Sequence, residues 1–156
     1  MRKTLTIIAL IIVISCTDKK LTAEKHDSEL EENWTCFTTK DSIPKLLILA
    51  LKETFENNFE MANFNEKFNE TDVIINDSIP DKKLQLLSRK NNLWRISYVQ
   101  GGFAKHYVFA ECKIINDSIF DFKISQTALR LDSNDSINKY ITEKKIVLKK
   151  IKILIK

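Results

Sequence analysis

Cysteine and histidine are the residues of this 156-residue chain best suited to nucleophilic or metal chemistry. Cys36 and Cys112 lie in no Cys-x-x-Cys motif and beside no basic run that would lower a thiol pKa. His26 and His106 stand apart, without the convergent spacing that zinc or copper sites require. His106 and Cys112 are six residues apart, roughly 20 Å along a strand, which is too far for proton transfer. The sequence therefore predicts no metal, no cofactor and no catalytic residue.

A short acidic phrase recurs along the chain. IINDSI-x-D occurs at 74–81 and at 114–121, and NDSI occurs again at 134–137. A calcium loop would need a denser set of oxygen ligands than these aspartates supply. Asn-Asp-Ser is typical of turns, so we interpret these copies as turns and place a loop over 132–138. The chain also has no Gly-rich phosphate loop, nucleophile elbow or His-Glu-x-x-His motif.

The first residues have the features of an export signal. Arg2 and Lys3 are basic, and 5–15 (LTIIALIIVIS) is almost wholly apolar. This run is too short to span a bilayer, which needs roughly 20 apolar residues. It fits a secretory signal peptide with the small residue Ser15 at the cut.

Cys16 makes this signal more specific. Val13-Ile14-Ser15-Cys16 resembles the lipobox of bacterial lipoproteins. The resemblance covers only the first 16 residues and implies that 1–15 are removed by signal peptidase II and that Cys16 is lipidated, incorporating palmitate. Several acyl chains hold a protein firmly on a membrane. The alternative is an uncleaved anchor or an ordinary signal peptide with an unrelated cysteine.

The residues after Cys16 bear on where the anchored protein would face. Thr17 is not the aspartate that retains some lipoproteins in the inner membrane, and Asp18-Lys19-Lys20 is not the acidic run that resembles a Bacteroidetes surface-export signal. We therefore expect a cell-envelope protein that faces the periplasm rather than the outer surface. The polar stretch 16–32 is expected to be a flexible tether, and 33–156 a single domain.

Export would place Cys36 and Cys112 in an oxidising compartment. A disulfide between them is then permitted, and two separate thiols are the alternative. The net charge of +4 becomes about +2 once Arg2 and Lys3 are removed, which is too small to indicate nucleic-acid binding.

The periodicity of 33–156 predicts an α+β domain. Apolar residues at helical spacing, preceded by Ser42 and Pro44, predict a helix over 44–62. Alternating patterns predict strands, and Gly101-Gly102 predicts a hairpin over 100–103. The strands are expected at 73–75, 84–88, 93–99, 106–115, 119–125 and 146–156. One N-terminal helix on an antiparallel meandering sheet is similar in outline to cystatin-like or NTF2-like folds, a likeness that implies no function.

Two groups of side chains leave alternatives open. The aromatic residues can either line a pocket or pack in the core; they are Trp34, Trp94, Tyr98, Tyr107 and Phe109. The C-terminal lysines can meet anionic lipid or form the solvated face of an edge strand; they are Lys144, Lys145, Lys149, Lys150, Lys152 and Lys156.

These observations favour a non-catalytic envelope lipoprotein that binds a protein or a small ligand, in an accessory, inhibitor or immunity role. The alternative is a small hydrolase or isomerase with a cone-shaped pocket. An enzyme should show a deep cavity with convergent ionisable groups, whereas a binding protein should show an exposed apolar patch or a free sheet edge.

Overall fold

The computed structural model describes residues 33–55, 59–73 and 77–153, and these form an α+β fold. The predicted signal peptide and the tether lie outside the described residues. The elements are β1 (Thr35–Cys36), η1 (Lys40–Ser42), α1 (Lys45–Thr54), β2 (Lys82–Lys90), β3 (Leu93–Gln100), β4 (His106–Ile115), β5 (Ser118–Thr127), α2 (Asn134–Thr142) and β6 (Lys149–Lys150). Among the described residues, no helix is long and apolar enough to cross a membrane.

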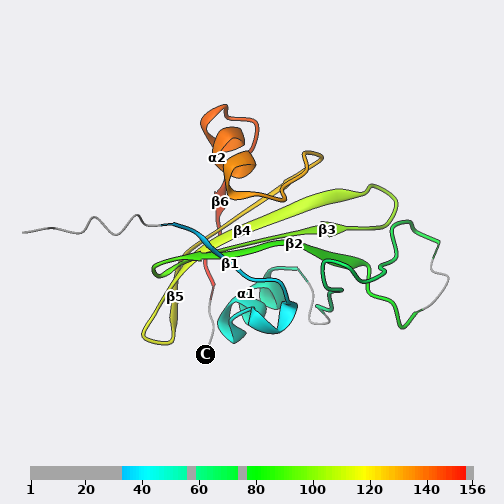
Figure 1. Ribbon diagram of the computed structural model, residues 1–156, viewed down its shortest axis with the longest axis horizontal. Coiled ribbons are helices and arrows are strands. Elements are labelled where there is room, and N and C mark those ends of the chain that lie inside the picture. Colours follow the sequence, from blue (N-terminus) through cyan, green and yellow to red (C-terminus); the bar gives the residue numbers. More distant parts are fainter. Residues whose placement is uncertain (1–32, 56–58, 74–76, 154–156) are drawn as a thin grey trace, which may run out of the picture. The chain divides into compact units, whose positions relative to one another are not determined.

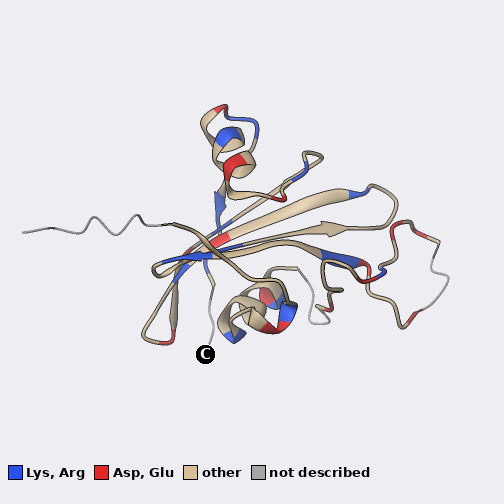
Figure 2. Ribbon diagram, in the orientation of Figure 1, with Lys and Arg blue, Asp and Glu red and all other residues tan. Residues whose placement is uncertain are grey.

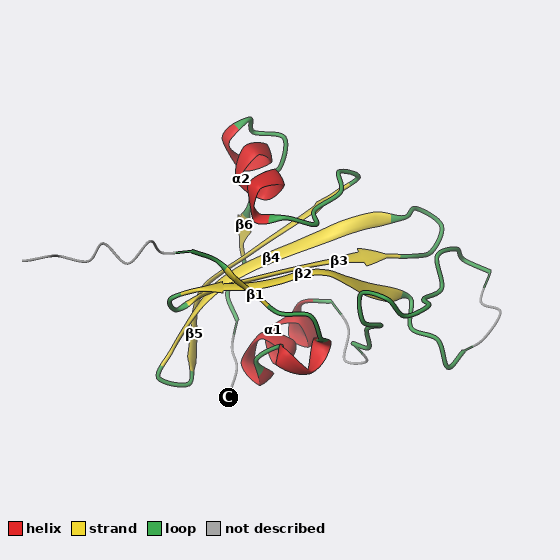
Figure 3. Ribbon diagram, in the orientation of Figure 1, coloured by secondary structure: helices red, strands yellow, loops and turns green. Residues whose placement is uncertain are grey.

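The six strands form one antiparallel sheet in the order β1-β2-β3-β4-β5-β6, as a meander (Figures 1 and 3). Asn116 and Asp117 turn the β4–β5 hairpin with φ of 48° and 54°, and Asn91 has φ of 54° in the β2–β3 turn. Asparagine and aspartate tolerate this left-handed conformation, which the tight hairpin turns require. The antiparallel sheet expected from the strand pattern is confirmed. The strand predicted at 73–75 is not part of it: Val73 lies in a bend, and 74 and 75 are outside the described residues.

The hairpins give the sheet two distinct ends. The β2–β3 and β4–β5 turns lie together at one end, which we call the turn end. Gln100 and His106 are paired at the other end, where the β3–β4 loop projects, and we call this the open end (Figure 1). Because Thr35 pairs with Arg89, the chain enters the domain at the turn end.

Both faces of the sheet are covered, by different helices (Figure 1). Leu47 and Leu51 of α1 pack on one face in the larger core cluster. Ile137 of α2 packs on the other face with Phe109 and Leu131. Successive residues along a strand point to opposite faces of the sheet. Tyr98 of β3 lies on the face of the first cluster, and Phe109 of β4 lies on the face of the second.

The helix at α1 is shorter than the predicted 44–62. It ends at Thr54, and Phe59 and Ala62 lie outside it, with 56–58 not described. Ala62 N–H donates to the carbonyl of Lys82 at 2.8 Å, and Leu84 N–H donates to the carbonyl of Ala62 at 3.0 Å. The apolar residues after Phe55 therefore complete the edge of β2 instead of extending the helix, because sheet hydrogen bonds outweigh their helical spacing.

A second helix replaces the loop predicted over 132–138. Ser133 accepts a hydrogen bond from Ser136 N–H and caps α2, whose Ile137 is fully buried. NDSI thus starts a helix at Asn134 and forms a hairpin turn at Asn116, since the tetrapeptide suits either. The placement of 134–137 in a turn was wrong.

The predicted C-terminal strand over 146–156 was also too long. Within 146–153, the part of this range that the structure describes, only Lys149 and Lys150 form a strand, β6. Before it, Ile146 packs in the α2 cluster, and after it Ile151 packs against the α1 cluster. The segment crosses from one side of the sheet to the other, so its alternating apolar residues serve two cores.

Candidate functional site

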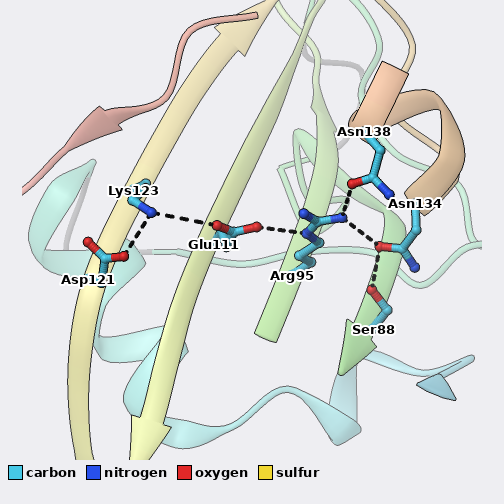
Figure 4. A network of polar contacts seen from close by, with 7 residues as sticks. All are labelled: Ser88, Arg95, Glu111, Asp121, Lys123, Asn134 and Asn138. Atoms are coloured by element: carbon cyan, nitrogen blue, oxygen red, sulfur yellow. Dashed lines mark hydrogen bonds and ion pairs between the residues drawn. The ribbon is translucent and has the colours of Figure 1, made fainter. Parts of the chain in front are cut away.

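A chain of polar contacts crosses the face of the sheet that α2 covers (Figure 4). Its centre is the ion pair between Arg95 of β3 and Glu111 of β4, with Nε of Arg95 2.8 Å from Oε2 of Glu111. These two residues are directly opposite each other in the β3–β4 register and are only 7% and 8% exposed, respectively. Figure 2 shows that charged residues occur within the strands as well as in the loops.

The network holds α2 to the sheet. Arg95 Nη1 donates to Oδ1 of Asn138 at 2.8 Å and to Oδ1 of Asn134 at 3.4 Å. The Ser88 hydroxyl donates to the same Asn134 oxygen at 3.1 Å. The Ser97 hydroxyl also donates to the carbonyl of Leu131, just before the helix. Hydrogen bonds from β2 and β3 thereby hold α2, and the segment that precedes it, against the sheet.

Beyond Glu111 the network continues to the edge of the sheet. Lys123 Nζ lies 3.9 Å from Oε1 of Glu111 and 2.8 Å from Oδ2 of Asp121. Lys150 of β6 reaches the second Asp121 oxygen at 3.0 Å. Hydrogen bonds from Lys123 and Lys150 lower the pKa of Asp121 to about 2, so its carboxylate is charged across the physiological range. Of the two lysines, Lys150 fastens the short strand β6 to β5, since Lys123 and Asp121 both belong to β5.

The network has a structural role. Both Glu111 oxygens face cations, and among the described residues no buried side-chain oxygen or nitrogen lacks a hydrogen-bond partner. The guanidinium of Arg95 also lies 4.2 Å from the ring centre of Trp34, so it fixes the start of the domain as well as α2. No trio of histidine, cysteine or acidic residues within the described ranges is placed to hold a metal.

Sequence reasoning missed this network because its members are far apart in the chain. The signal that could have found it is hairpin register. Once Gln100 is paired with His106, the residues five positions farther from the hairpin loop on each strand, Arg95 and Glu111, must also be paired.

Cys36 and Cys112 are separate free thiols in the structure, not a disulfide. Cys36 is exposed on β1 and Cys112 is fully buried on β4, three strands away. Three strand spacings of about 4.8 Å place their backbones about 14 Å apart, whereas a disulfide needs Cα atoms within about 7 Å. Burial, and secondarily the charge of Glu111, raises the pKa of Cys112 to about 12, so this thiol stays protonated.

The aromatic residues that could have lined one pocket are divided between the two faces. Tyr98 packs edge-on against Phe59 in the α1 core, while Phe109 lies in the α2 core. Trp94 stacks on Phe37 at 5.3 Å between ring centres. These residues therefore pack within the two cores or beside them instead of lining one pocket.

The open end carries a shallow groove of about 410 Å³. It lies between the end of α1 and the β3–β4 loop, and its lining is mixed. The apolar and aromatic lining residues are Phe55, Tyr98, Phe103, Ala104 and Val108, and the polar ones are Lys82, Gln100, His106 and Gln126. A larger hollow of about 600 Å³ lies under the start of α1, and its lining residues include Ile43, Phe59 and Ser78.

The β3–β4 loop projects an aromatic side chain from this groove. Phe103 is 95% exposed, the most exposed large hydrophobic side chain among the described residues. The loop beneath it is well anchored: Gly101 N–H donates to the Asp81 carbonyl at 2.7 Å, and Lys105 pairs with Glu70 at 3.0 Å. Aromatic side chains, phenylalanine among them, are enriched at protein–protein interfaces.

The groove has little of the chemistry that a hydrolase or isomerase would require. Its ionisable lining groups are Lys82, Tyr98 and His106, and no carboxylate is among them. His106 Nδ1 is hydrogen-bonded to the Ala104 carbonyl at 2.8 Å, which orients the ring locally. The acid–base groups at this groove are therefore limited to a lysine, a tyrosine and a histidine.

No protein-family model, curated protein or solved structure matches this chain.

Proposed function

We propose that this protein is a lipid-anchored, non-catalytic protein of the bacterial cell envelope that binds a protein partner at its open end. The observation that carries the anchor is the succession of features in the N-terminal sequence: basic Arg2 and Lys3, the apolar run 5–15, and Cys16 at its boundary. The proposal includes removal of 1–15, lipidation of Cys16, and a periplasm-facing domain joined by the tether 16–32.

The open end supports the binding part of this proposal. Phe103 projects outward instead of lining an enclosed cavity, and small-molecule sites are usually concave and enclose most of their ligand. A projecting aromatic side chain suits insertion into a pocket of another protein. An inhibitor, immunity or assembly-accessory role would use such a surface. The cystatin-like or NTF2-like outline belongs to this proposal as a matter of fold alone.

The anchor is tested by the substitution Cys16→Ala. We expect the native chain to incorporate labelled palmitate and to sediment with the membrane fraction, and the variant to lose both, because the acyl chains supply the membrane affinity. The measurement is palmitate labelling with fractionation of cells. Cys36→Ala is the matched control and should label like the native chain, since Cys36 lies 20 residues beyond the predicted site. Label that persists in Cys16→Ala would refute the anchor.

The binding surface is tested in cells by photo-crosslinking. A photoreactive phenylalanine analogue at position 103 should form a discrete adduct with one protein, because this side chain would be buried at the interface. The same analogue at position 49 is the control, since Leu49 is also an exposed apolar side chain, at 47%, but lies on α1. Equal labelling at the two positions, or none at 103, would contradict binding at the open end.

A further inference from the structure

A row of alternating basic and apolar residues crosses the sheet at the turn end. Lys90 of β2 pairs with Leu93 of β3, Leu93 with Lys113 of β4, and Lys113 with Phe120 of β5. Residues paired in this way point to the same face, which is the face that α2 covers further along the strands. Trp34 lies beside the row, because the next residue, Thr35, is paired with Arg89. We call these five residues the turn-end row.

The turn-end row is more exposed than the next row inward. Phe120 is 51% exposed and Lys113 is exposed, while Arg95 and Glu111 are covered by α2. Ile115, at the tip of the same hairpin, is 39% exposed. Leu93 and Phe120 belong to neither core cluster, whereas Ile114 and Ile119, on the other face, pack against the α1 cluster.

The lipid-bearing part of the chain leads to this same end. Trp34 is among the first described residues, and 18 positions separate it from Cys16. Its ring is held over the Arg95 guanidinium at 4.2 Å, so the path from the tether into the domain passes beside the turn-end row. Phe103 lies at the opposite end of the eight-residue strand β3, about 27 Å away at the usual rise per residue.

The composition of the row matches an anionic bilayer surface. Tryptophan and phenylalanine favour the membrane–water interface, and lysines flanking them attract anionic headgroups. Of the acidic residues near the hairpin, Asp121 is neutralised by Lys123 and Lys150, and Asp117 lies in the turn itself. The exposed Lys152 follows β6 at the same edge and adds a further cation.

We propose that the turn-end row docks this domain on an anionic membrane surface and so directs the open end away from the bilayer. This inference rests on the proposed lipid anchor, which would hold the row close enough to the membrane for a weak surface to act. A docked row leaves Phe103 pointing toward a partner in solution.

The test is depth-dependent quenching of tryptophan in the full lipidated protein. Trp34→Phe and Trp94→Phe together remove both tryptophans of the chain. Phe120→Trp or Phe103→Trp then introduces a single reporter at the turn end or the open end. In vesicles of phosphatidylglycerol and brominated phosphatidylcholine, we expect quenching at position 120 to exceed that at 103 at least about threefold, since bromine quenches only at bilayer depth.

Charge reversal separates docking from mere proximity. One charge near an anionic surface changes partition by about fivefold, so Lys113→Glu should lower the quenching at position 120 by about half or more. Lys67→Glu makes the same charge change at an exposed position in the loop before β2 and should leave the quenching unchanged. Salt at about 0.5 M should reduce the quenching at position 120 when Lys113 is kept, because salt screens exposed charges.

The outcomes distinguish the docking from the anchor. Palmitate incorporation is scored on the same protein, so a failure of the anchor is seen independently. If the protein is lipidated and vesicle-bound but positions 120 and 103 are quenched equally, docking on the membrane is overturned. The turn-end row would then be a surface for binding another protein. Quenching at 120 that Lys113→Glu and Lys67→Glu reduce alike would also overturn it.

Discussion

Arg95→Met is expected to destabilise the protein by about 3–5 kcal/mol, the cost of leaving one member of a buried ion pair without its partner. The Glu111 carboxyl group would be left at 8% exposure, with only Lys123, at 3.9 Å, facing it. Asn134 and Asn138 of α2 would lose the guanidinium that they contact. Because a domain of this size is stable by only about 5–15 kcal/mol, much of the free energy of unfolding would be lost.

The free energy of unfolding can be measured by urea titration followed by circular dichroism. Lys123→Met is the matched control. This lysine is 30% exposed, its contact with Glu111 is long and its pair with Asp121 is partly exposed, so its loss should cost no more than about 1 kcal/mol. The double variant Arg95→Met, Glu111→Leu should recover much of the stability, because it leaves no unpaired buried charge. A cost below about 1 kcal/mol for Arg95→Met alone would show that the pair does not hold the two strands and α2 together.

Local patterns predicted the sheet well because hairpin turns are encoded locally. Asn116-Asp117 adopts the left-handed conformation that a tight hairpin needs, and Gly101-Gly102 marks the β3–β4 connection. Once these turns are placed, the strands between them alternate and their order follows the chain. The β2–β5 part of the meander therefore needs no information from distant residues, whereas β1 pairs with β2 through Thr35 and Arg89, which are far apart in the chain.

The errors fall where tertiary contacts decide the local structure. Helix α2 has nine residues and depends on Arg95 and Ser88, which lie 39 and 46 positions before Asn134. The segment 59–62 has helical spacing in the sequence but does not form a helix, because its backbone hydrogen-bonds to β2. Local propensity weighs little against such contacts in short elements.

The candidate site was less predictable than the fold for a related reason. In the sequence, Phe103 is an ordinary hairpin residue. Only the structure shows that Asn69 and Glu70, in the loop before β2, support the loop that carries it. The aromatic residues looked like one group in sequence, yet strand alternation divided them between two cores. Composition alone therefore could not say which aromatic side chain stays at the surface.

Gly101→Ala is the other substitution from which we expect a large effect, about 3 kcal/mol, the upper part of the range for overpacked sites. A Cβ at this position would lie 1.9 Å from the carbonyl oxygen of Asn69. That obstacle is backbone and cannot rotate away, so residues 69 and 70 would have to retreat. The hydrogen bond from Gly102 N–H to the Glu70 carbonyl, at 3.3 Å, would then be lost with them.

Gly102→Ala supplies the comparison that isolates this close approach. A Cβ there would meet no atom within 4 Å, and the penalty would come only from its φ of 111°, which costs about 1–3 kcal/mol in a residue with a side chain. Hydrogen exchange of 63–73 should accelerate in Gly101→Ala and change little in Gly102→Ala, because only the first displaces that segment. Equal exchange in the two variants would mean that the loop is not supported by Asn69. If exchange accelerates as expected, adduct formation at position 103 should fall with it, since the anchored loop is what presents Phe103 to a partner.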